Sequence, residues 1–296
     1  APPRLDGPAV MRVSVGSLAR RYRWRIGLSL VLILIEGIGY LLGPLVIGVA
    51  VDGLLADSFS GLLALAGLAV AIITVSAIRR LYDARLYASM FEDVAGDVAA
   101  RETAASSDVS VVAARAGLVE EVVAFFQESV PELTTGVVGI LGTILILAGI
   151  DARLLVACIL LLALVVVVYA VTGRLNLRLN EGYNDELERQ VAALRHDEAS
   201  SRAHFARLVR WDVKLWDLDT ANTTIVAAGA AVFLVYSIVV LVTGEPEIGL
   251  VISGLIYVLA YIELLATLPG YAQELIRLRE IAGRLETPAG ALERDG

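Results

Sequence analysis

The sequence has little cysteine, lysine and histidine, and each shortage excludes a class of chemistry. Of 296 residues, one is cysteine, one is lysine and two are histidine. The single cysteine, Cys158, cannot form an intrachain disulfide, and its apolar neighbours predict a small core residue. A phosphate-binding loop needs a lysine preceded by glycine. The single lysine, Lys214, follows Val213, so we expect that this chain is not an enzyme and does not hydrolyse ATP alone.

The two histidines do not indicate a metal site. His196 and His204 are eight residues apart, a little over two helical turns, and no cysteine lies near them. We therefore predict no metal ligands, and we expect both histidines at solvated helix positions. We also predict no cofactor within this chain and no nucleic-acid partner.

Apolar residues are abundant instead. They make up 57% of the sequence, and the mean hydropathy is +0.75. A helix rises about 1.5 Å per residue and a bilayer core is about 30 Å thick, so a run of about 20 apolar residues can cross it. The sequence therefore predicts an all-α membrane protein with six transmembrane helices and membrane lipid as its solvent. The apolar runs are residues 26–51, 61–78, 133–150, 154–173, 223–243 and 248–268.

The positive charges lie almost entirely on one side of these runs. If the runs cross the membrane alternately, 23 of the 24 basic residues fall on one side, and only Arg153 falls on the other. Lysine and arginine accumulate in cytoplasmic loops. We therefore predict a multi-pass protein of the plasma membrane, namely a bacterial inner membrane, with both termini in the cytoplasm.

Two long connections lie on the predicted cytoplasmic side. Residues 79–132 and 174–222 contain few breaking residues, and their apolar positions recur at helical spacing. The spanning helices should therefore continue beyond the membrane as long helical extensions. We predict a cytoplasmic N-terminal segment at 1–25, a six-helix domain at 26–285 and a cytoplasmic tail at 286–296.

Local motifs add a family resemblance. The segment Gly43–Leu54 resembles the end of the first helix in the transmembrane domain of ABC exporters. Ser107–Val109 resembles the Ser-Asp-Val before that family's third helix, and Gly249–Leu285 resembles its sixth helix and exit. The resemblance covers about 260 residues. It implies an exporter-like six-helix domain that forms half of a homodimeric pathway, with the fourth and fifth helices crossing to the partner.

The sequence also departs from that family. A nucleotide-binding domain normally follows the six helices, whereas this chain stops about 28 residues after Leu268. The family's usual segment before the fifth helix is replaced by Arg210–Asp219. We therefore interpret the chain as a stand-alone ABC-type membrane domain, to which ATP would be relevant only through a separate subunit.

Acidic and aromatic residues within the apolar runs are candidates for a substrate or ion pathway. A carboxylate at membrane depth costs about 2.5–3.5 kcal/mol on insertion scales, so it should face the bundle interior or a cavity. Glu36 and Glu263 are such residues, and each could instead form a helix-packing hydrogen bond. The candidate pathway residues are Glu36, Tyr40, Tyr257, Tyr261 and Glu263.

Two further pairs lie at or beyond the membrane boundary. Glu128 and Glu132 are spaced i,i+4 around Pro131 and could attract a cation or form a solvated interfacial face. Trp211 and Trp216 lie in a predicted cytoplasmic extension. They could dock a partner, or lie at headgroup depth before the fifth helix.

These observations predict a membrane transport protein. We expect a homodimer that moves a cationic or amphipathic small molecule through a central cavity, because acidic and aromatic groups attract such molecules. The energy source stays open between a separate ATPase subunit, as in a split ABC exporter, and an ion gradient. The alternative is a membrane receptor or scaffold subunit that docks a cytoplasmic partner.

Overall fold

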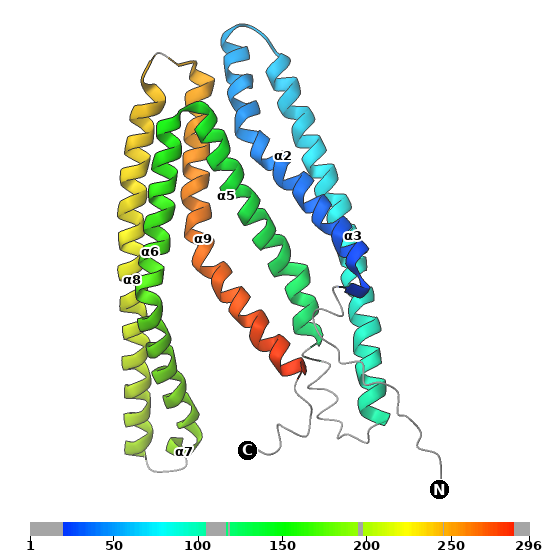
Figure 1. The fold of residues 1–296 in the computed structure, drawn as a ribbon, viewed down its shortest axis with the longest axis vertical. Coiled ribbons are helices and arrows are strands. Elements are labelled where there is room, and N and C mark those ends of the chain that lie inside the picture. The colour runs from blue at the N-terminus through cyan, green and yellow to red at the C-terminus, as the bar shows by residue number, and fades with distance from the viewer. Residues whose placement is uncertain (1–19, 105–116, 118, 195–197, 245, 287–296) are drawn as a thin grey trace. The chain divides into compact units, whose positions relative to one another are not determined.

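The computed structural model describes residues 20–104, 117, 119–194, 198–244 and 246–286 (Figure 1). Within these residues every regular element is helical, and six helices are long and apolar enough to cross a membrane. The predicted fold class is confirmed. The elements are α2 (Arg23–Leu55), α3 (Ser60–Ala104), the π-helix η1 (Phe125–Ser129), α5 (Val130–Ile150), α6 (Ala152–Glu188), α7 (Gln190–Leu194), α8 (Glu198–Val242) and α9 (Ile248–Glu286).

Several helices extend well past their apolar runs. α3 and α8 have 45 residues each. At 1.5 Å per residue, each is about 67 Å long, roughly twice the thickness of a bilayer core. Pro44 and Pro269 both lie inside helices and end neither.

Short turns join the helices on the side with few basic residues. Between α2 and α3, Asp57 adopts φ 56°, a left-handed conformation that aspartate tolerates better than most residues. Between α5 and α6, the Asp151 side chain accepts a hydrogen bond from the Arg153 backbone N–H at 2.7 Å. It thereby caps α6. Between α8 and α9, Gly244 takes φ 96°, where a side chain would be strained.

The chain forms two compact units. One comprises residues 1–142 and 266–296, and the other comprises residues 143–265. Accordingly α2 and α3 belong to the first unit, while α6, α7 and α8 belong to the second. The helices α5 and α9 contribute residues to both units.

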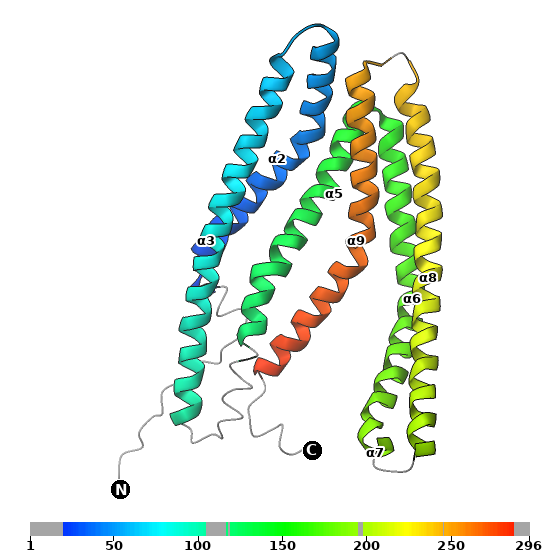
Figure 2. The ribbon, with the colours of Figure 1, turned by 180° about the vertical axis from the view of Figure 1, so that it is seen from behind.

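In the first unit, α2 and α3 form an antiparallel hairpin (Figures 1 and 2). Their backbones approach closely near the turn. A Cβ at Gly61 would lie 2.6 Å from the Ala50 Cα and 2.7 Å from the Val49 carbonyl oxygen. Small residues at such crossings let transmembrane helices pack at short distance.

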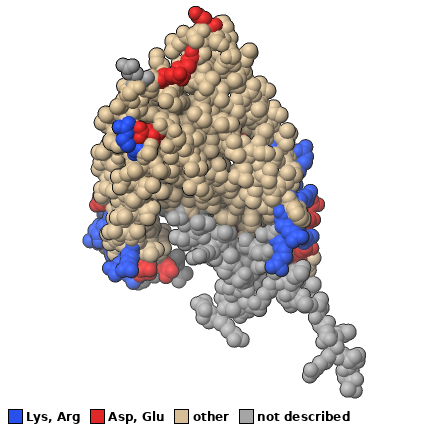
Figure 3. Space-filling view, turned by 45° about the horizontal axis from the view of Figure 1, so that its top comes forward, with Lys and Arg blue, Asp and Glu red and all other residues tan. Residues whose placement is uncertain are grey.

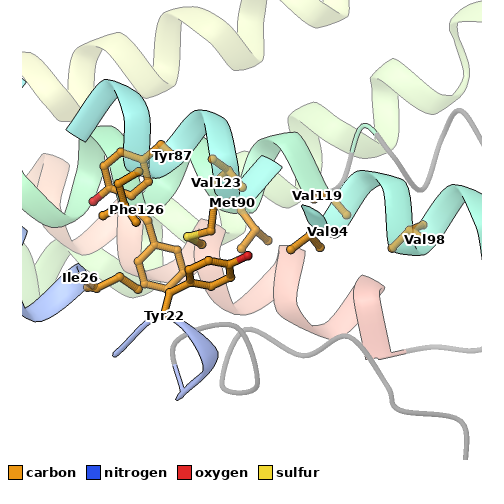
Figure 4. Packing of buried hydrophobic residues seen from close by; sticks show 11 residues of the cluster. Tyr22, Ile26, Tyr87, Met90, Val94, Val98, Val119, Val123 and Phe126 are labelled. Atoms are coloured by element: carbon orange, nitrogen blue, oxygen red, sulfur yellow. The ribbon is translucent and has the colours of Figure 1, made fainter. Parts of the chain in front are cut away.

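The extension of α3 has an apolar core (Figure 4). Tyr22 and Ile26, from the start of the chain's described part, pack with Met90 and Val94 of α3. The third contributor is the helical segment before α5, which supplies Val119, Val122, Val123 and Phe126. Because Met90 and Val122 are completely buried, this core can hold the extension together in water as well as in lipid.

The second unit is built on the hairpin of α6 and α8, which lie side by side in both views (Figures 1 and 2). A stripe of buried side chains at helical spacing, including Leu154, Cys158 and Leu161, faces the packed side of α6. Cys158 is fully buried, which confirms the prediction of a core residue.

Large apolar side chains are exposed along the spans. Leu63, Ile73, Leu145 and Val232 are each about 70% exposed. Figure 3 shows a face that is mostly uncharged, with charged side chains gathered in a few places. Soluble monomers rarely expose contiguous apolar surface on this scale, so the solvent of these helices is lipid or another protein surface.

Candidate functional site

Glu36 is a buried carboxylate with partners from the neighbouring helix. It is 7% exposed, and it lies on the side of α2 that faces α3. The Arg79 guanidinium donates to one Glu36 oxygen through Nε, and the Ser76 hydroxyl donates to the other. This arrangement stabilises an ionised carboxylate at membrane depth because its charge is neutralised and both oxygens are hydrogen-bonded.

Arg79 extends this site to a second carboxylate. Its Nη1 lies 3.1 Å from Oδ2 of Asp83, one turn further along α3. Asp83 is 6% exposed, and its other oxygen accepts a hydrogen bond of 2.6 Å from the Ser29 hydroxyl. The ion cluster of Glu36, Arg79 and Asp83 thus joins α2 to α3, and its formal charge is −1.

Sequence reasoning identified only one member of this cluster. Arg79 and Asp83 stand at the boundary of the second apolar run, where the prediction assigned them to a cytoplasmic connection. The signal that could have found them is their i,i+4 spacing with opposite charge. A further indication was Glu36 in the preceding helix, because a nearby cation lowers the cost of a carboxylate at membrane depth.

Glu263 has different surroundings. It lies on α9 within the last apolar run, its side chain is exposed, and it forms no ion pair with any described residue. A carboxylate exposed to hydrocarbon would be strongly disfavoured. We therefore expect Glu263 to face water, a ligand or another protein surface when the chain is in a membrane.

The tyrosines near Glu263 are not on its face. Tyr257 and Tyr261 are 1% and 0% exposed. Tyr261 donates a hydrogen bond of 2.8 Å to the carbonyl oxygen of Cys158 on α6, and its ring packs against Phe233 of α8. Glu263 follows Tyr261 by two residues, a little more than half a helical turn. Within this unit both tyrosines are packing residues, and the structure does not bring them together with Glu263.

The remaining candidates are dispersed. Tyr40 on α2 is 57% exposed. Glu128 lies in η1 and Glu132 in the first turn of α5, and both are exposed. A π-helical turn precedes Pro131, which has no N–H to donate to a regular α-helical bond. Neither glutamate forms an ion pair with a described residue.

The two tryptophans of α8 have different surroundings. Trp211 is half-buried against α6, and a Cβ at Gly182 would lie 2.8 Å from its ring. The Lys214 ammonium lies 4.5 Å from the centre of the same ring. Trp216 is 65% exposed. Of the two predicted docking residues, Trp216 therefore presents the larger free surface.

One prediction on this extension was wrong. His204 was expected at a solvated position, but it is fully buried, and its Nδ1 lies 2.8 Å from Oε1 of Glu186 on α6. Arg207 donates to the same oxygen at 2.7 Å. The antiparallel hairpin places residues 18 positions apart side by side, which periodicity within one helix could not show. His196 lies outside the described residues.

The comparison with known families decides the identity of this helical bundle. Residues 16–249, about four fifths of the chain, match the family described as the ABC transporter transmembrane region. The chain belongs to this family. The resemblance noted in the sequence is confirmed, and the ABC transporter transmembrane region is a multi-pass membrane domain concerned with transport. No curated protein matches the chain.

Within a domain concerned with transport, the ion cluster and Glu263 differ in what their carboxylates can bind. The ion cluster pairs Arg79 with two carboxylates and links two helices, as a structural element does. Among the described residues of the apolar runs, Glu263 has an exposed carboxyl side chain. Such a group can bind a cation or take up a proton.

Proposed function

We propose that the protein moves a cationic or amphipathic small molecule across the membrane and that Glu263 binds its positive charge. The observation that supports this role is the exposure of Glu263 on an apolar helix, without an ion-pair partner among the described residues. The cost of a carboxylate at this depth is offset when a cation or water reaches it.

Glu36 would then serve another purpose. Its carboxylate already binds Arg79 and Ser76, so a cationic substrate would have to displace a hydrogen-bonded guanidinium. We propose that the ion cluster fixes α2 against α3 during the transport cycle. Tyr257 and Tyr261 would support the position of α9 through their burial rather than contact the substrate.

We further propose that two copies of the chain enclose the pathway. In a single copy Glu263 is exposed beside apolar side chains such as Leu259, which is 54% exposed. A second copy would bury that apolar surface and enclose two Glu263 carboxylates in a water-accessible space. The arginine distribution favours cytoplasmic termini and a bacterial plasma membrane for this homodimer.

The family favours ATP as the energy source, hydrolysed on a nucleotide-binding domain outside these 296 residues. The exposed Trp216 ring, on the predicted cytoplasmic extension of α8, is a candidate contact for such a partner. An ion gradient acting on Glu263 is the second candidate, since acidic residues within spanning helices mark ion and proton pathways.

Transport of a fluorescent cation tests the proposal. Inverted membrane vesicles would be prepared from cells producing the wild type, Glu263→Gln or Glu247→Gln. Glu247 is the matched control because it is an exposed glutamate in the turn before α9. Uptake of ethidium would be followed with ATP and, separately, with an imposed pH gradient. We expect at least a tenfold loss of uptake in Glu263→Gln and wild-type uptake in Glu247→Gln.

Each result has a defined meaning. Uptake supported by ATP in the presence of an uncoupler identifies an ATP-driven transporter, and uptake supported by the pH gradient alone identifies a gradient-driven one. Equal uptake by Glu263→Gln and wild type would overturn the role of Glu263. If uptake under both energy sources is no greater than in vesicles that lack the folded protein, cation transport is rejected. That result would favour a receptor or scaffold.

A further inference from the structure

An apolar groove runs along the α6–α8 hairpin, within the second unit. Its volume is about 650 Å³. On α6 it begins at Arg153 and ends at Leu164, and on α8 it runs from Ala228 to Tyr236. The two helices lie side by side over this stretch in both views (Figures 1 and 2). The groove is therefore a feature of one packed hairpin.

Residue size explains the groove. Ala157 on α6 and Ala228 on α8 leave space between the two helices, and the Leu164 side chain packs over Gly229. Leu161 and Phe233 are each 4% exposed and form its floor, while Leu160 and Val232, at 65% and 70% exposure, form its rims. The lining is hydrocarbon over most of its length, which suits a hydrocarbon ligand.

The length of the groove matches one membrane leaflet. Eleven residues separate Arg153 from Leu164, which corresponds to about 16 Å along a helix. Half of a bilayer core is about 15 Å thick. The groove begins at the first turn of α6, where the apolar run begins, and so it extends from one membrane surface to about the midplane.

The surface end of the groove carries a pair of opposite charges. The Arg153 guanidinium donates to the Asp151 carboxylate at 2.8 Å, and the Arg153 side chain is still 53% exposed. This hydrogen bonding holds the pKa of Asp151 below its usual value, so the carboxylate is ionised at neutral pH. The pair is neutral in sum but presents a cation and an anion side by side. Tyr236 lines the same end, as aromatic residues do at headgroup depth.

We propose that this groove binds one acyl chain of a zwitterionic phospholipid, from the leaflet on the side of the α5–α6 turn. The phosphate lies against the exposed edge of the Arg153 guanidinium, and the ammonium group lies beside Asp151. A neutral ion pair complements a headgroup that carries both charges, whereas a net anionic headgroup places no cation beside Asp151. The site is separate from Glu263 and does not depend on which substrate is transported.

Native mass spectrometry of the purified protein tests this site. Delipidated protein would be titrated with dioleoyl phosphatidylethanolamine. Ala228→Leu places a larger side chain in the groove. The matched control is Ala227→Leu, since residue 227 is also exposed but points to the opposite face of α8. Ala157→Leu fills the groove from α6, and Arg153→Gln removes the cation.

We expect one tightly retained phospholipid per chain in the wild type and in Ala227→Leu. Both groove-filling variants should bind at least tenfold more weakly, with unchanged melting temperature relative to Ala227→Leu. Arg153→Gln should weaken binding several-fold, and phosphatidylglycerol should bind several-fold more weakly than phosphatidylethanolamine. Equal retention by Ala228→Leu, Ala157→Leu and wild type would overturn the groove as a lipid site.

The same samples also test whether a phospholipid or a second copy of the chain occupies the groove. If both groove-filling variants retain lipid normally but no longer form dimers, a second copy of the chain occupies the groove and the proposal is wrong. Equal or stronger binding of phosphatidylglycerol would overturn the assignment of a zwitterionic headgroup.

Discussion

The charged residues of this chain differ in whether the fold itself satisfies them. Glu36, Arg79 and Asp83 form a buried cluster, while Glu263 is exposed and has no ion-pair partner among the described residues. All four belong to helices with long apolar runs, so membership of such a helix does not distinguish the three paired residues from Glu263. The distinction depends on which helix faces each side chain.

The ion cluster should respond unequally to the loss of its members. Arg79→Met leaves two buried carboxylates without their cation, and we expect it to lower the free energy of unfolding by about 3–5 kcal/mol. Adding Glu36→Gln to Arg79→Met should restore part of this loss, because one uncompensated charge is removed. Thermal unfolding of both variants in detergent measures the effect. A double variant less stable than Arg79→Met would contradict this account.

The cap of α6 should make stability depend on acidic pH. Hydrogen bonding by Arg153 lowers the pKa of Asp151 in the folded state. Asp151 therefore contributes stability above its unfolded pKa, and that contribution is lost as the pH falls through the lower folded pKa. Asp151→Asn keeps a capping side chain but removes the titrating group. We expect the melting temperature of wild type to fall more between pH 6 and pH 3 than that of Asp151→Asn, and equal slopes would refute this.

At the scale of elements, helix pairs are held by close backbone approach as well as by polar contacts. The α2–α3 hairpin combines the crossing at Gly61 with the ion cluster further along. The α6–α8 hairpin combines Asn222 donating to Thr172 with the Glu186–His204 contact in its extension. Each long hairpin is therefore held together by contacts at more than one position along its length.

Glycine substitutions in α3 should separate packing from helix propensity. Gly61→Ala forces a methyl group against the Ala50 backbone, and we expect a loss of about 1–3 kcal/mol. Gly67→Ala is the control, because a Cβ there meets nothing within 4 Å. That variant should be neutral or up to about 1 kcal/mol more stable, since alanine favours the helix. Equal melting temperatures for the two variants would count against a tight crossing.

At the scale of the whole molecule, two compact units share α5 and α9, and arginine placement predicts which ends of the helices face the cytoplasm. Between the apolar runs, residues 79–132 and 174–222 hold 13 basic side chains, and the three short connections hold one, Arg153. This asymmetry predicts the orientation of the chain in the membrane and says nothing about its internal packing.

Cysteine labelling can measure this topology, because the native Cys158 is buried and should react slowly. A membrane-impermeant maleimide added to intact cells should label Ser60→Cys and Glu247→Cys. Glu92→Cys, on the extension of α3, should react only in inverted vesicles. All three native residues are exposed, so unequal accessibility within the fold does not confuse the result. Labelling of Glu92→Cys from outside the cell would reverse the predicted orientation.

The sequence by itself determined the membrane class, the six spans and the family resemblance, because apolar run length and local motifs are properties of neighbouring residues. It also predicted helices that continue past the spans, since helical periodicity is local. It did not show that Arg79 neutralises Glu36, that His204 is buried against Glu186, or that Tyr261 points away from Glu263. Only the tertiary structure decided these points, because each depends on which face of one helix meets another helix. The groove between α6 and α8 has the same origin, since small residues far apart in the chain leave it only when two helices pack together.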